Sequence, residues 1–99
     1  MKIPKSVIIG GFKYRVEYRN GLVGTKGQEL VGEINYSKQI IFIDPDRHEQ
    51  LQQSTFIHEC LHGLYHSIGG EEPDEDKIEI LEHAIFRFLI ENSKLGIVS

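Results

Sequence analysis

His58, Glu59 and His62 belong to the segment His-Glu-Cys-Leu-His, whose spacing could hold a divalent metal ion and supply a general base. On an α-helix, residues four apart lie almost above one another, so both imidazoles could reach one ion at about 2.0 to 2.1 Å. Glu59 is turned one helical step away from the pair, toward a water molecule rather than the ion. Zinc lowers the pKa of bound water to about 7, and a neighbouring carboxylate can then accept its proton. The pattern therefore predicts hydrolysis of an amide bond.

The residues around this motif predict a helix with one apolar side. We expect that side to pack on a core and Glu59 to look outward into a cleft. The alternative is that three polar side chains merely decorate a solvated helix face. The uncharged segment Thr55-Phe56-Ile57 just before the motif favours the metal site. The apolar side would consist of Ile57, Cys60, Leu61, Leu64 and Ile68.

A catalytic zinc site usually has three protein ligands, so a third must come from elsewhere in the chain. His66 continues the row of histidines but lies about 12 Å along the helix axis from His58, too far to share one ion. The acidic residues of a second predicted helix are better candidates. Glu75 is our first choice as ligand, with Glu79 holding an imidazole by a hydrogen bond, and Glu79 and Glu82 are the alternative ligands.

The remaining acids at the start of that second helix are expected to form a solvated N-terminus, where the helix dipole favours negative charge. They are Glu71, Glu72, Asp74 and Asp76. A hydrolase also needs a donor for the developing oxyanion. The sequence leaves four possibilities open, namely Tyr36, Tyr65, His66 and His83.

With these residues in place, the chain resembles the small phage- and prophage-encoded ImmA/IrrE-like zinc metallopeptidases, within the thermolysin-like class. The resemblance spans nearly the whole chain and is most specific over residues 55–63. The weaker segments support it through their order: residues 9–16, 32–34 before 39–43, and 75–79 through 88–92. The chain departs from the family at Glu82, where a small apolar residue is expected.

The resemblance implies an endopeptidase that cleaves a specific protein substrate and has a phage or prophage origin. His58 and His62 would be zinc ligands, Glu59 the catalytic acid/base, and an acidic residue near Glu75 the third ligand. It also implies that an extended substrate adds as a strand to a sheet edge beside the metal helix, and we expect residues 40–43 to form that edge. The alternative function is a metal-binding protein-interaction module with little or no hydrolysis, and a third possibility is a structural domain without metal.

The predicted fold class is α+β within one domain, residues 1–99. A small antiparallel sheet of three or four strands would occupy residues 1–44, followed by a helical hairpin with helices in residues 45–69 and 72–93. We expect strands at residues 7–9, 12–18, 33–36 and 40–43. Apolar residues at helical spacing mark the buried stripe of the second helix: Ile78, Leu81, Ile85, Phe88 and Leu89. Residues 20–32 contain four glycines and are expected to form a mobile loop, either a lid or a connector.

Composition excludes several classes of protein. The chain has 99 residues, 39% hydrophobic and 26% charged, and a formal net charge of −4, which argues against a nucleic-acid partner. It contains no apolar run long enough to span a membrane and no signal peptide pattern, which predicts a cytoplasmic protein. Cys60 is the single cysteine, so no intramolecular disulfide can form. Its place on the predicted apolar side makes it a small core residue rather than a nucleophile.

Overall fold

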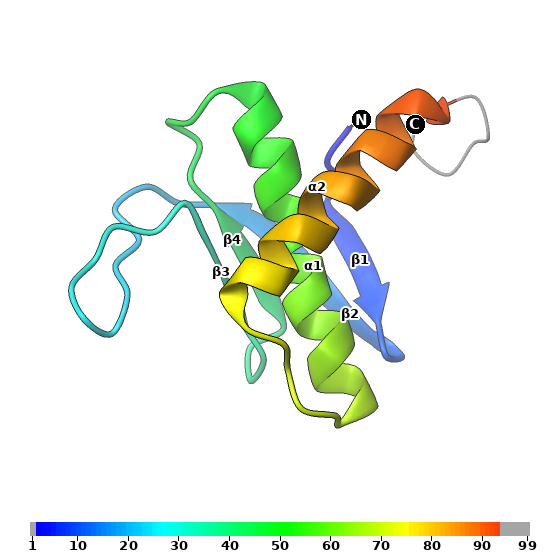
Figure 1. The fold of residues 1–99 in the computed structure, drawn as a ribbon. Helices are drawn as coiled ribbons and strands as arrows, with labels where there is room; N and C mark the ends of the chain where they lie inside the picture. Colours follow the sequence, from blue (N-terminus) through cyan, green and yellow to red (C-terminus); the bar gives the residue numbers. More distant parts are fainter. Residues whose placement is uncertain (1, 94–99) are drawn as a thin grey trace.

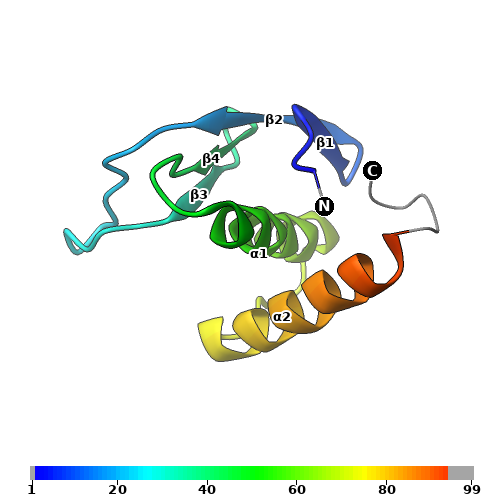
Figure 2. The ribbon, with the colours of Figure 1, turned by 90° about the horizontal axis from the view of Figure 1, so that it is seen from above.

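The computed structural model describes residues 2–93 and has three layers. A four-stranded sheet forms the first, helix α1 (Glu49–Ile68) lies across one face of the sheet, and helix α2 (Glu75–Glu91) packs on the far side of α1 (Figure 2). Figure 1 shows the two helices crossing in front of the sheet. The predicted α+β class, a small sheet followed by a helical hairpin, is confirmed.

The sheet contains β1 (Ser6–Ile9), β2 (Phe12–Tyr18), β3 (Gly32–Asn35) and β4 (Ile40–Ile43) in the order β1-β2-β4-β3. The pairs β1-β2 and β3-β4 are antiparallel hairpins, whereas β2 and β4 run parallel. The sheet is therefore mixed, not wholly antiparallel. The long connection after β2 leads to β3, which does not pair with β2. The chain then returns as β4, which lies between β2 and β3 and pairs with both, so β3 is the edge strand. The expectation that residues 40–43 form an open edge is thus wrong.

The core lies between the sheet and α1. Alternate residues of β4 face opposite sides, so Ile41 and Ile43 are fully buried against the helix. Ile40 and Phe42 point to the other side, where Leu22 from the connection after β2 covers them. That connection is therefore packed on the sheet at Leu22, and it carries one isolated bridge, Val23–Glu29.

Helix α1 begins later than the sequence suggested. Asp44 accepts a hydrogen bond from the Asp46 amide at 2.9 Å and pairs with Arg47 at 3.1 Å, which makes a turn rather than a helical start. The cap is His48, whose Nδ1 accepts from the Leu51 amide at 3.1 Å. Its C-cap is Gly69 at φ 69°, a left-handed conformation that favours glycine.

Only part of the predicted apolar side of α1 is buried. Ile57 and Leu61 belong to the core, but Leu64 and Ile68, toward the C-terminal end of the helix, are exposed. The hairpin between β1 and β2 reaches this end at Gly10, which has a φ of 58°. A side chain there would lie 2.6 Å from Ser67 Cβ, so glycine permits the close approach of hairpin and helix.

Helix α2 is capped by Asp74, whose carboxylate accepts from the Lys77 amide at 3.0 Å. Pro73 lies just outside the helix, not in its first turn. Because α2 packs mainly on one helix, its buried face is narrow: Ile78 is fully buried, whereas Leu81 and Phe88, predicted to be buried, are exposed. Within residues 2–93, neither helix has the length and hydropathy needed to cross a membrane.

Candidate metal centre

The two histidines of the motif occupy successive turns of α1 on the side that faces the start of α2. Their Nε2 atoms lie 3.2 Å apart. Both side chains are largely buried, with exposed fractions of 20% for His58 and 17% for His62. The four-residue spacing therefore does what helix geometry predicts: it directs two ring nitrogens to the same point.

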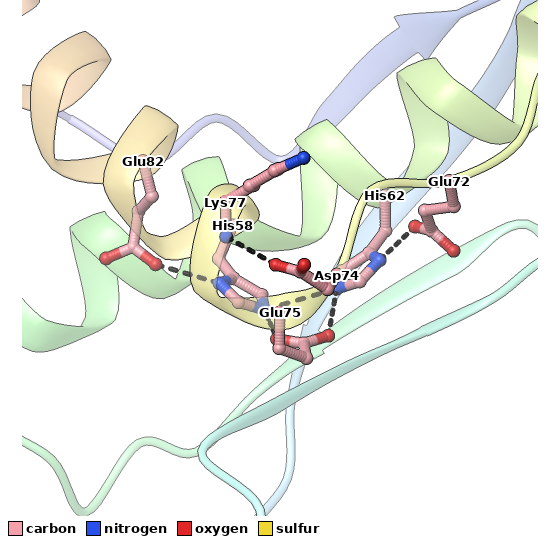
Figure 3. A network of polar contacts seen from close by, with 7 residues as sticks. All are labelled: His58, His62, Glu72, Asp74, Glu75, Lys77 and Glu82. Carbon is pink, nitrogen blue, oxygen red and sulfur yellow. Dashed lines mark hydrogen bonds and ion pairs between the residues drawn. The ribbon is translucent and has the colours of Figure 1, made fainter.

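Glu75 completes the group from the first residue of α2. Its Oε1 lies 2.9 Å from His62 Nε2, and its Oε2 lies 3.2 Å from His58 Nε2 (Figure 3). The Gly69 cap turns the chain after α1, and the Asp74 cap fixes where α2 begins. His58, His62 and Glu75 form a group that could hold a metal ion, with one ligand atom from each within 4.8 Å of the others.

Two further carboxylates hold the outer nitrogens of the imidazoles. Glu82 Oε1 lies 2.8 Å from His58 Nδ1, and Glu72 Oε1 contacts His62 Nδ1. The prediction that Glu79 fills this role is wrong, because Glu82 lies two turns after Glu75 on the face toward α1, whereas Glu79 is exposed. Glu72 was expected to be solvated, but the segment between the helices folds back onto His62. Glu82 thus contacts the outer nitrogen of His58, away from the point where the two Nε2 atoms and Glu75 converge.

These contacts leave an excess of acceptors at the centre of the group. A carboxylate can only accept, so each Nδ1 must donate to its glutamate, and in a neutral imidazole the Nε2 then carries a lone pair. Two such lone pairs and the Glu75 carboxylate converge with no donor between them. A bound cation would satisfy all three, so the donor set fits a metal ion.

Without a metal, the same carboxylates favour a protonated imidazole. Burial opposes the charged form of His62, but the hydrogen bond to Glu72 and the charges of Glu59, Glu72 and Glu75 outweigh it and raise its pKa. The surroundings of His62 are therefore negative enough to stabilise a positive charge, whether a proton or a metal ion.

Glu59 does not look outward as the helix pattern suggested; it is buried, with 7% of its surface exposed. Its carboxylate lies against the start of β3, where a Cβ on Gly32 would come within 3.3 Å of Glu59 Oε2. Burial raises the pKa of Glu59 to about 7, with the two imidazoles opposing and the Glu75 and Glu33 carboxylates adding to the shift. A carboxyl with this pKa can exchange a proton near neutral pH.

Of the four possible oxyanion donors, Tyr36 lies at the end of the edge strand whose start contacts Glu59. It follows β3 directly, and its ring stacks on His66 at 3.9 Å between centroids. Burial, together with the charges of Glu72 and Glu59, raises the pKa of Tyr36 to about 12, so the phenol stays protonated. Tyr65 instead packs against the core, whereas His83 lines a cavity that also contains His58 and Glu59.

Cys60 follows Glu59 in the motif but has a different environment. Burial raises the pKa of its thiol to about 12, and the Glu59 charge adds to the effect. The thiol therefore stays protonated, which agrees with its predicted role as a small packing residue.

Two cavities lie along α1, on either side of the histidines. One, about 310 Å³ in volume, includes Val31, Leu51 and Glu79 together with His58 and Glu59. The other, about 330 Å³, lies at the opposite end, near Tyr36 and His66. Edge strand β3 runs from the first cavity toward the second, because Val31 and Tyr36 flank it.

A scan against models of protein families finds no match, and searches of curated proteins and of solved structures find none either. Functional inference for this chain therefore relies on its own residues and their geometry.

Sequence reasoning identified the three residues that the structure brings together and named Tyr36 and His66 as possible oxyanion donors, but it missed the contact of Glu72 with His62. Glu72 lies in the connection between the two helices, whose course no periodic pattern predicts.

Proposed function

We propose that this protein is a zinc-dependent endopeptidase that cleaves a specific protein substrate, of the ImmA/IrrE-like kind that its sequence resembles. The observation that carries the proposal is the convergence of His58, His62 and Glu75 beside the buried carboxylate of Glu59. This combination pairs a metal-binding group with a proton acceptor that does not itself belong to the group.

Zinc suits the spacing of the donors. Two tetrahedral ligands at about 2.0 to 2.1 Å from one zinc ion lie about 3.3 Å apart, and the two Nε2 atoms are separated by 3.2 Å. Two imidazoles and one carboxylate are a known catalytic zinc set, which leaves one coordination position open. When bound, zinc would polarise the substrate carbonyl and acidify the attacking water.

In this proposal Glu59 takes a proton from the attacking water and passes it to the nitrogen of the leaving amine. In the metal-free protein burial raises the pKa of Glu59 to about 7, and a catalytic acid/base works best when its pKa lies near the working pH. Glu82 and Glu72 fix the ring orientations of the histidines. Tyr36 would donate its hydroxyl hydrogen to the developing oxyanion.

The edge strand offers a place for an extended substrate. β3 pairs with β4 on one side only, so its other side presents free backbone donors and acceptors. The role that we expected of residues 40–43 thus moves to β3. A peptide added there would run past Glu59 at Gly32 and past Tyr36 at the opposite end.

The first experiment measures metal in protein purified without chelators or a histidine tag, by elemental mass spectrometry. We expect close to one zinc per chain, lost in His58→Ala with His62→Ala. Absence of metal even after zinc addition would contradict the proposal.

The second experiment measures peptide cleavage. Glu59→Gln should abolish it while zinc is retained, and Tyr36→Phe should lower kcat by roughly 100-fold with little change in KM. Zinc binding with partner-dependent activity that persists in Glu59→Gln would instead support the metal-binding interaction module. The cytoplasmic location remains a prediction, which fractionation of the producing cells would test.

A further inference from the structure

The cavity of about 310 Å³ beside the metal centre has the features of a pocket for one substrate side chain. It shares His58 and Glu59 with the centre, so whatever enters it lies next to the reacting bond. Its volume is at the lower end of the range for ligand pockets, about 300 to 1,000 Å³. It therefore has room for a single side chain.

The walls of this cavity combine an apolar part with a negative part. Val31, before β3, and Leu51, in the first turn of α1, contribute apolar surface. Glu79 and Glu82 contribute carboxylates from α2, and His83 adds an imidazole from the same helix. A side chain with a long apolar stem and a charged end would match both parts.

The two α2 carboxylates differ in how they are used. Glu82 is hydrogen-bonded to His58. Glu79, one turn after Glu75, forms neither a hydrogen bond nor an ion pair with any residue in the described range 2–93. Its charge is thus available to an incoming ligand, about 6 Å along the helix axis from Glu75.

We propose that this cavity selects a lysine or arginine side chain on a residue adjacent to the bond that is cleaved. The inference rests on the proposed peptidase function and names its substrate class. The aliphatic stem would lie against Val31 and Leu51, and the ammonium or guanidinium group would pair with Glu79. An uncharged cavity of this shape would instead accept leucine or methionine equally well.

The test begins with zinc-loaded protein and a library of peptides from a digested proteome, assayed at pH 8, where imidazoles are generally uncharged. Mass spectrometry identifies the cleaved bonds, and matched peptides then carry lysine, norleucine or glutamate at the preferred position. We compare wild type with Glu79→Gln and Glu79→Lys. Glu91→Gln is the matched control, since it removes the same charge from the same helix about 18 Å away.

We expect lysine or arginine at one of the two positions that flank the cleaved bonds. Glu79→Gln should reduce the lysine-to-norleucine ratio of kcat/KM by about 3- to 10-fold. Glu79→Lys should favour glutamate, and Glu91→Gln should leave the ratio unchanged. Cleavage without a basic preference, or a preference that both Glu79 variants retain, would overturn the inference while leaving the peptidase proposal intact.

A binding measurement separates failure of this inference from failure of the proposed function. The Glu59→Gln protein should bind the lysine peptide more tightly than the norleucine peptide in calorimetry, and adding Glu79→Gln should remove the difference. If the wild type cleaves no peptide, the peptidase proposal fails, and this comparison alone decides the ligand preference of the cavity. Equal binding of the two peptides would overturn that preference.

Discussion

Replacing Gly32 with alanine should destabilise the protein at the point where β3 meets the segment of α1 that carries Glu59. The added methyl group would collide with Thr55 Cγ2 and would lie 3.1 Å from the Phe42 carbonyl oxygen and 3.3 Å from Glu59 Oε2. Thr55 is 4% exposed, so it cannot move aside into solvent. Overpacking of this kind costs about 1 to 3 kcal/mol.

A second substitution tests whether the steric contact is the cause. Thr55→Ser removes the methyl that Gly32→Ala would strike, at a cost of about 1 kcal/mol for the lost buried group. If the collision dominates, the double variant should be more stable than the sum of the single effects predicts, by about 1 kcal/mol or more.

The assay is urea denaturation of the metal-free protein, followed by circular dichroism, with the four members of the double-mutant cycle compared at one pH. Gly70→Ala is the control, because the nearest atoms to its added methyl, in the Ile68 side chain, would be 4.0 Å away, and it should change stability by about 0.5 kcal/mol at most. Additive effects of Gly32→Ala and Thr55→Ser would refute the reasoning.

Two further predictions concern the buried carboxylates. Glu82→Gln should weaken zinc binding by about 10- to 100-fold in competition with a chelating dye, because its carboxylate orients His58, whereas Glu79→Gln should not; equal effects would contradict this. In the metal-free protein, Glu59 holds its proton to a pH of about 7 when folded, but releases it near its ordinary value of 4.5 when unfolded. The free energy of unfolding of the wild type should therefore fall as pH rises from 4.5 to 7. Because Glu59→Gln lacks this titrating group, its free energy of unfolding should rise relative to wild type across that window, by about 3 kcal/mol at most. A stability difference that does not change with pH would disprove that shift.

The local sequence predicted the elements that depend on nearby residues. The spacing of His58 and His62 follows from 3.6 residues per turn, which holds in any α-helix. The limits of β4 and the end of α1 at Gly69 follow from an apolar run and from a glycine that can adopt a left-handed conformation. Glu75 was the preferred third residue because it and Glu79 lie four residues apart on the second predicted helix, so that one carboxylate could bind the ion while the other held an imidazole.

The sequence by itself thus determined the α+β class, the two helices and the metal-binding motif, since each depends on periodicity or on a few adjacent residues. Only the tertiary structure decided that β4 is interior, that Glu59 is buried against Gly32, and that Glu82 and Glu72 hold the imidazoles. Each of these depends on strand order or on the angle between packed helices. Such features arise from contacts between residues far apart in the chain, which no local pattern encodes.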